Sequence, residues 1–203
     1  MTKIALVGAS GNAGSRILKE LSDRGHAVTA IARNPERIAA LPGVTAVAGD
    51  AKDAAALAAL LRGHDVAISS VHFTASDPEA LIAAARESGV SRYIVVGGAG
   101  SLESEPGKRL IDSPDFPAAY RAEATAGAAF LDRLKAEDGL NWTFLSPSAV
   151  FAPGTRTGTF RLGTDQLLVG PEGSHISFED YAVALVDEIE TPAHPRQRFT
   201  VGY

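Results

Sequence analysis

The chain has 203 residues, no cysteine and a formal net charge of -5 at pH 7. This length predicts one domain, residues 1–203, with a sizeable core. The acidic balance argues against nucleic acid or an anionic membrane as a partner, and the lack of cysteine excludes disulfides and thiolate chemistry. The first apolar run is too short to span a bilayer, and no cleavage pattern follows it, so we expect a cytoplasmic protein.

Apolar runs of strand length alternate with helical patterns through the first half of the chain. Strands are predicted over 3–8, 27–33, 44–50, 65–71 and 92–98, and helices over 12–25, 35–41, 53–63 and 77–89. Helix starts have Asn12, Asp53 and Asp77 as expected caps, and helix ends have Gly25, Gly63 and Gly89. The strands are almost wholly apolar, as expected where helices cover both faces. This alternation predicts an α/β fold with a doubly wound parallel sheet.

The pattern changes after residue 98. Residues 103–120 are rich in Pro, Gly and charge, which predicts a long loop. The remaining elements are a helix over 121–137, a strand over 141–146, short strands and loops, a helix over 178–190 and a strand over 196–203. The part from about 147 is expected to complete a substrate pocket as a small C-terminal extension.

Three glycines stand at equal spacing between the first predicted strand and helix. Gly8 would allow the tight turn, Gly11 would let the backbone approach a pyrophosphate, and Gly14 would let the helix pack closely on the sheet. The phosphates would meet free N–H groups at the helix start. The segment predicted to bind the dinucleotide comprises Gly8, Ala9, Ser10, Gly11, Asn12, Ala13 and Gly14. The spacing is GxxGxxG rather than GxGxxG, and a glycine-rich turn without a ligand is the alternative.

The end of the second strand indicates which dinucleotide is bound. An NAD site usually has a carboxylate there, whereas this chain has Arg33, with Arg37 four residues later. A guanidinium pairs with a 2′-phosphate that a carboxylate would repel. The position and charge therefore predict NADP(H), and a solvated surface arginine is the alternative.

Four segments carry a resemblance to a known family. They are "GASGNAG" after the first strand, "RNPER" after the second, "GD" closing the third and "FLSPS" closing the sixth. They resemble the atypical short-chain dehydrogenase/reductase group. The whole chain is similar to bacterial NAD(P)H-binding proteins of the NADH-flavin reductase kind, which are relatives of biliverdin reductase B and NmrA-like proteins.

The resemblance implies a Rossmann fold, bound NAD(P)(H) and hydride transfer. It further implies that Asp50 lies near the adenine, although the same residue is placed to cap or precede the next helix. Ser146, Pro147 and Ser148 resemble the family segment whose backbone touches the nicotinamide amide.

The carboxyl ends of the other strands, where ligands bind in open α/β sheets, provide further candidates. The backbone of Ser69, Ser70 and Val71 is expected to pass the nicotinamide ribose, and Gly97 and Gly98 to give the cofactor room. His72 is a candidate proton donor or stacking group, with a solvated loop residue as the alternative. Ser101 lies slightly beyond the position of the usual catalytic serine.

The usual catalytic pair of the group is YxxxK, and this chain departs from it. Tyr120 is followed by Ala124 where the lysine belongs, so Tyr120 either lines the pocket or is structural. The pattern identifies no catalytic residue, and His72, Ser101 and Tyr120 are weak candidates. No spacing suggests a metal site. Asp112, Asp115 and Glu123 are expected to be solvated, as are Arg156 and Arg161, unless the arginines bind an anionic group.

The absence of the lysine favours an acceptor that can take its proton from water. The leading hypothesis is an NADPH-dependent reductase of a flavin such as FMN, a quinone or a similar planar small molecule. The alternative is a non-catalytic NADP(H)-sensing regulatory protein of NmrA-like type. Either is expected to be a monomer or a homodimer.

Overall fold

The computed structural model describes all residues from 1 to 203, and its centre is one sheet of eight strands. The strand order is β10-β12-β8-β5-β4-β1-β2-β3, and every neighbouring pair is parallel except β10 and β12. The chain winds outward from β1 in both directions, so the doubly wound sheet is confirmed. Its strands are β1 (Lys3–Val7), β2 (Ala27–Ala32), β3 (Val44–Ala48), β4 (Val66–Ser69), β5 (Arg92–Val96), β8 (Trp142–Pro147), β10 (Arg161–Gly163) and β12 (Gln197–Gly202).

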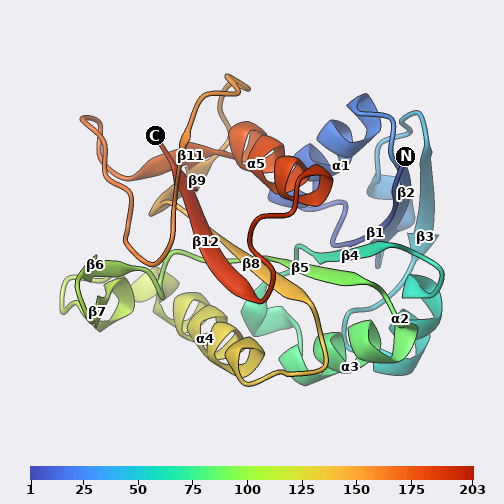
Figure 1. The fold of residues 1–203 in the computed structure, drawn as a ribbon, viewed down its shortest axis with the longest axis horizontal. Helices are drawn as coiled ribbons and strands as arrows, with labels where there is room; N and C mark the ends of the chain where they lie inside the picture. The colour runs from blue at the N-terminus through green and yellow to red at the C-terminus, as the bar shows by residue number, and fades with distance from the viewer.

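Helices cover both faces of the sheet (Figure 1). The helices α1 (Asn12–Asp23) and α5 (Phe178–Glu190) lie above it in that view, with α2 (Ala54–Leu61), α3 (Pro78–Ser88) and α4 (Ala118–Lys135) below it. Two buried clusters fill the layers, one around Tyr181 and the other around Phe130 and Phe144. The central strands are buried as predicted, whereas β3 is exposed because it forms the edge.

Most helix boundaries follow the predicted caps. Asp53 accepts a hydrogen bond from Ala56 N–H at 3.0 Å, and Gly89 ends α3 with φ +74°. Asn12 is a correction, since Gly11 is the N-cap and Asn12 is already the first helical residue. The helix expected over 35–41 is also wrong. Only the single 3₁₀ turn η1 (Pro35–Arg37) forms, because Ile38 returns to extended backbone.

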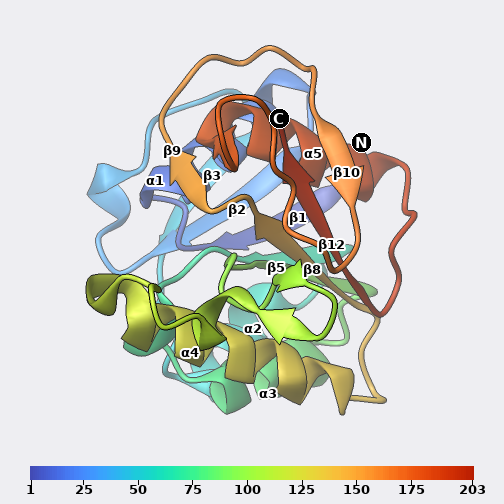
Figure 2. The same ribbon diagram turned by 90° about the vertical axis from the view of Figure 1, so that its left-hand side faces the viewer.

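The segment expected to be a long loop contains regular structure. The strands β6 (Glu103–Glu105) and β7 (Lys108–Arg109) form a hairpin, which the 3₁₀ turn η3 (Leu110–Asp112) follows. Arg109 pairs with Asp132 of α4 at 3.0 Å, so this hairpin is fastened to the helix below it (Figure 2).

The C-terminal part adds a second ribbon outside the main sheet. The strands β9 (Val150–Ala152) and β11 (His175–Ser177) pair in parallel, and Phe151 packs edge-on against Phe178 with ring centroids 4.5 Å apart. Between β9 and β10 the chain forms a long arch over the top of the molecule in Figure 2. None of the helices has the length and apolar character needed to cross a membrane.

Candidate functional site

Two glycines shape the turn that joins β1 to α1. Gly8 has φ +85°, and a Cβ placed on it would stand 2.0 Å from the carbonyl oxygen of Ser70. A Cβ on Gly14 would stand 2.1 Å from the carbonyl oxygen of Gly8, so the first turn of α1 rests directly on the end of β1. Backbone atoms exclude a side chain at both positions, which explains why both residues are glycine.

The middle glycine is exposed and leaves backbone donors free. Gly11 is the N-cap of α1 and provides no side-chain cap. The N–H groups of Asn12, Ala13 and Gly14 have no acceptor within the protein. Free N–H groups at the positive end of a helix attract phosphate. The turn therefore fits the pyrophosphate of a dinucleotide.

Two exposed arginines lie at the end of β2, beside this turn in the sheet. Arg33 precedes η1 and Arg37 is its last residue, and neither guanidinium group forms an ion pair or a hydrogen bond. Among the other arginines of the chain, only Arg62 at the far end of α2 also lacks a partner. After β3, Asp50 accepts the N–H of Lys52 at 3.0 Å, so it shapes the approach to α2 and leaves one carboxylate oxygen unbonded.

The end of β4 presents backbone rather than side chains. Ser69 is buried, and its hydroxyl shares a hydrogen bond of 2.9 Å with the hydroxyl of Tyr93. Burial raises the pKa of Tyr93, so this partner keeps its proton. Ser70 donates its N–H to the carbonyl of Val7 at 2.8 Å, and Val71 follows half-buried.

The turn after β4 is held by the carboxylate of a residue for which the sequence predicts a solvated side chain. Glu123 of α4 accepts the N–H groups of Phe73 at 2.7 Å and Thr74 at 3.0 Å, the Thr74 hydroxyl at 2.7 Å, and lies 3.3 Å from His72 Nδ1. Burial alone would raise the pKa of Glu123, but these hydrogen bonds, led by Thr74, lower it. The expectation of a solvated Glu123 is therefore wrong, and His72 is 86% exposed beside it.

No sequence pattern pointed to this role. Glu123 is one of several charged residues on an amphipathic helix, and its partners lie 49 to 51 positions away.

The ends of β5 and β8 are more tightly packed than expected. A Cβ on Gly97 would meet the ring of Phe144 at 2.3 Å, so packing of the core already requires glycine at this position. Gly98 is less crowded, with the ring of Phe73 3.5 Å from a Cβ position. Ser148 is buried and donates its hydroxyl to the carbonyl of Val201 at 3.1 Å, which leaves mainly the backbone of this segment to meet a ligand.

A buried arginine lies below these strand ends. Arg198 of β12 has a side chain only 3% exposed and donates through Nε to Asp165 at 2.9 Å. Its Nη1 lies 3.4 Å from the hydroxyl of Ser101 and 3.5 Å from that of Ser146, so both serines are held in the interior. Pro147 follows Ser146 in β8 and is also buried. Sequence analysis missed Arg198 because its partner Asp165 lies 33 residues away on another segment.

Three other candidate residues make no contact with the residues of the predicted cofactor site. Tyr120 lies in the first turn of α4, is 68% exposed and has no hydrogen-bond partner. Arg156 pairs with Glu20 of α1 at 2.7 Å, and Arg161 donates to the carbonyl of Tyr203, so both guanidinium groups already have a partner within the protein. No cluster of potential metal ligands occurs.

The predicted cofactor residues line neither of two cavities, one in the C-terminal part and the other mainly against α1. One of about 290 Å³ is lined only by residues from 150 onward, including Thr155, His175 and Tyr203. The other, of about 370 Å³, has only polar lining residues, among them Arg16, Glu20 and Arg156. The chain after residue 147 thus forms a cavity of its own.

The sheet order, the glycine turn and the free helix terminus together define a Rossmann-type dinucleotide-binding protein. The family profile described as NAD(P)H-binding matches residues 8–192, and the chain belongs to this family. The resemblance drawn from the four sequence segments is thereby confirmed.

Three solved structures are similar over the full length of the chain. A protein from Burkholderia pseudomallei, proposed to be exported, is 47% identical, with both chains covered in full and a TM-score of 0.90. A proposed epimerase from Bacteroides thetaiotaomicron is 39% identical, covering 100% of this chain and 97% of that one, with a TM-score of 0.94. A proposed NADH-flavin reductase from Streptococcus pneumoniae is 35% identical, covering 100% and 99%, with a TM-score of 0.86. The three proteins share one fold, whereas their names describe different properties or activities.

Proposed function

We propose that the protein is an NADPH-dependent reductase that passes hydride to a flavin, a quinone or a similar planar acceptor. The observation that carries the proposal is the turn from Gly8 to Gly14, with its free N–H groups and the unpartnered arginines nearby. NADPH, when bound, supplies the hydride. The chain's own contribution is to hold the dinucleotide at the sheet edge and to leave an acceptor access to it.

The preference for NADPH rests on Arg33 and Arg37. Both guanidinium groups are exposed and have no internal partner, so pairing with a 2′-phosphate would break no existing contact. The residue directly after β2 is Arg33, at the position where an NADH site usually has a carboxylate that accepts from the ribose hydroxyls.

Two absences support the proposed acceptor: the lysine of the usual catalytic pair, and a guanidinium group without a partner in the chain from Arg109 onward. Ala124 replaces the lysine that would make Tyr120 acidic, which disfavours alcohol dehydrogenation and epimerisation. Every arginine from Arg109 onward has a partner, including Arg156, Arg161 and Arg198. No free guanidinium remains there for an anionic acceptor. This favours an uncharged ring, such as a quinone or riboflavin, over a phosphorylated flavin such as FMN. The proposal also includes a cytoplasmic monomer or homodimer with no nucleic-acid or membrane partner.

The test follows oxidation of NADPH and of NADH at the nicotinamide absorbance, with riboflavin, FMN and a simple quinone as acceptors. A binding titration with each dinucleotide accompanies it. We expect saturable turnover with NADPH, faster with riboflavin or quinone than with FMN. Tight NADPH binding without turnover on any acceptor would instead identify a dinucleotide-sensing protein. Absence of dinucleotide binding would overturn both functions.

A further inference from the structure

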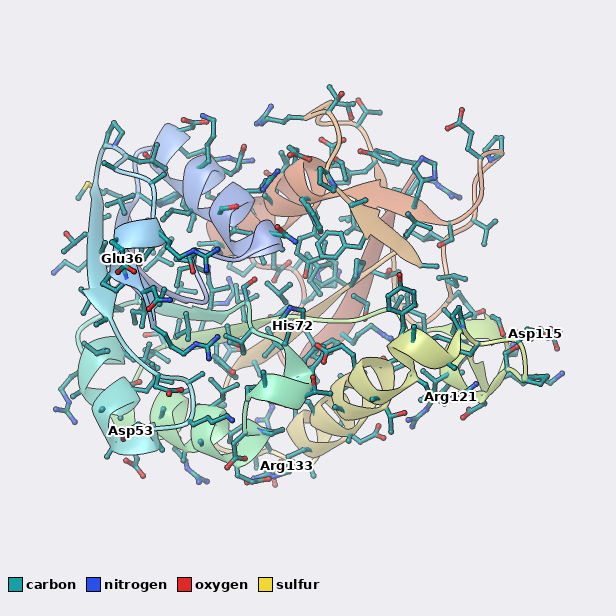
Figure 3. All side chains as sticks on the ribbon, turned by 180° about the vertical axis from the view of Figure 1, so that it is seen from behind. Glu36, Asp53, His72, Asp115, Arg121 and Arg133 are labelled. Carbon is teal, nitrogen blue, oxygen red and sulfur yellow. The ribbon has the colours of Figure 1, made fainter.

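The pair formed by His72 and Glu123 lies at the edge where the acceptor must approach. Ser70, two residues before His72, touches the glycine turn through its carbonyl oxygen, and Phe73, one residue after it, packs beside Gly98. His72 therefore stands between the ends of β1, β4 and β5. Figure 3 shows it between α1 above and the turn η2 (Phe73–Ala75) below.

The Glu123 carboxylate fixes how the imidazole presents its two nitrogens. Its Oε1 lies 3.3 Å from His72 Nδ1, and hydrogen bonds from the 73–74 backbone hold the carboxylate in place. An ionised carboxylate accepts hydrogen bonds and donates none, so this contact is a hydrogen bond when Nδ1 carries the proton, which is the tautomer we expect. The other nitrogen, Nε2, has no partner and belongs to a side chain that is 86% exposed.

Charged groups nearby do not compete for this imidazole. Arg121, on the same helix as Glu123, points away and donates to the carbonyls of Ile111, Ser113 and Phe116. Glu123 is therefore the one ionisable group in contact with His72.

We propose that His72 is the proton donor to the acceptor and that Glu123 is the residue that positions it; this rests on the reductase function proposed above. As hydride reaches a quinone, the Nε2–H bond of the imidazolium breaks and an O–H bond forms on the quinone oxygen. The electron pair of the broken bond stays on Nε2. The products are the hydroquinone, the oxidised dinucleotide and a neutral imidazole. Nδ1 of this imidazole keeps its proton and its hydrogen bond to the Glu123 carboxylate. Water then returns the proton to Nε2.

The decisive comparison uses two planar acceptors that differ in their need for a proton. A neutral quinone needs one proton with each hydride, whereas N-methylacridinium, a planar cation, becomes neutral on taking hydride alone. The quantity measured is the ratio of kcat with quinone to kcat with N-methylacridinium, after subtraction of the uncatalysed rates. We expect His72→Gln to lower this ratio by about 10-fold to 100-fold, at or below the usual range for general acid catalysis.

Control variants distinguish a loss of proton donation from a loss caused by disturbing the turn after β4. Glu87→Gln removes an exposed carboxylate on α3 that has no partner, and it should leave the ratio unchanged. Glu123→Gln should lower the ratio less than His72→Gln, and it should lower it no further in the His72→Gln background. Additive losses would show that Glu123 only holds the turn and would overturn its assigned role. An unchanged ratio in His72→Gln would overturn the donor.

A spectroscopic measurement tests the pair without any turnover. Long-range proton–nitrogen correlation spectra of the dinucleotide-free protein at alkaline pH report which nitrogen of His72 is protonated. We expect the Nδ1–H tautomer in the wild type and a shift toward the Nε2–H tautomer in Glu123→Gln. The Nε2–H tautomer in the wild type would contradict the pair. Failure of the reductase function would be recognised separately, since the wild type would then reduce neither acceptor.

Discussion

Charged residues play opposite roles in the two halves of the sheet, on either side of the central strands. On the side of β1, β2 and β3, the site is made of backbone, and the arginines Arg33 and Arg37 have no partner. On the side of β8 and β12, the arginines hold protein segments: Arg156 ties the arch after β9 to α1, and Arg198 ties Asp165 to the interior.

This difference shows where a ligand's charge can be recognised. Guanidinium groups without an internal partner gain a hydrogen-bonded ion pair when a phosphate arrives, whereas those already paired would have to give up a contact. The first side therefore supports the proposal that the phosphates of a dinucleotide bind there. On the second side the arginines already hold protein segments, which supports the proposed acceptor, an uncharged planar ring.

The largest expected effect comes from breaking the backbone contact on the first side. Gly8→Ala places a methyl group 2.0 Å from the Ser70 carbonyl oxygen and forces φ +85° on alanine. We expect a loss of about 3 kcal/mol in the free energy of unfolding and loss of NADPH binding. Urea unfolding and a binding titration measure these.

Gly63→Ala is the matched control for that substitution. Gly63 has φ +81° with nothing within 4 Å of the added methyl, so only the conformational cost of about 1 kcal/mol should remain. Equal losses at the two positions would mean that the contact between Gly8 and Ser70 contributes nothing.

The next effect concerns the unpartnered arginines. Arg33→Asp should weaken NADPH binding by about 2 kcal/mol, a factor of about thirty in Kd, because a charge-assisted hydrogen bond is lost. The Kd for NADH should stay the same or fall. Arg62→Asp, which removes the unpartnered arginine at the far end of α2, should change neither. An unaltered preference in Arg33→Asp would remove the assignment of NADPH.

A smaller effect is expected where a buried carboxylate ties the two sides together. The hydrogen bond from Arg156, ahead of the one from Arg24, lowers the pKa of Glu20 despite burial. Because the folded pKa lies below the unfolded one, its stabilisation is complete above about pH 5 and disappears as pH falls through the folded pKa. Glu20→Gln should lower the free energy of unfolding by about 1.5 kcal/mol at pH 7 and by less in acid.

The comparison residue for Glu20 is on the same helix. Asp23 forms an exposed pair with Lys19, and Asp23→Asn should cost less than about 0.5 kcal/mol. Chemical unfolding of both variants between pH 4 and 8 measures the difference. A pH-independent loss in Glu20→Gln would contradict the role of its charge.

The first side was predictable from sequence because its signals are local. The glycines stand within seven residues, Arg33 follows its strand directly, and Asp53 caps α2 through the N–H of Ala56, three residues on. Such patterns depend on backbone conformation and helix periodicity, which neighbouring residues largely determine.

The second side was not predictable because its contacts join distant segments. Glu123 meets the turn after β4 across about fifty residues, Arg198 meets Asp165 across 33, and Arg156 meets Glu20 across 136. One sequence gives no sign of which charged residues will be paired in this way. The contact that requires glycine at position 97 was not predictable for the same reason, since the ring that a Cβ would meet belongs to Phe144 on another strand.

The smallest effect is expected at Tyr120, and it tests the choice of proton donor. The Tyr120 ring is 68% exposed, its hydroxyl has no partner, and Ala124 provides no cation to make it acidic. Tyr120→Phe should therefore change kcat with a quinone by less than about twofold, within the range expected for an exposed side chain that takes no part in proton transfer. Steady-state turnover beside His72→Gln measures this. A loss of tenfold or more in Tyr120→Phe alone would move proton donation from the turn after β4 to the start of α4.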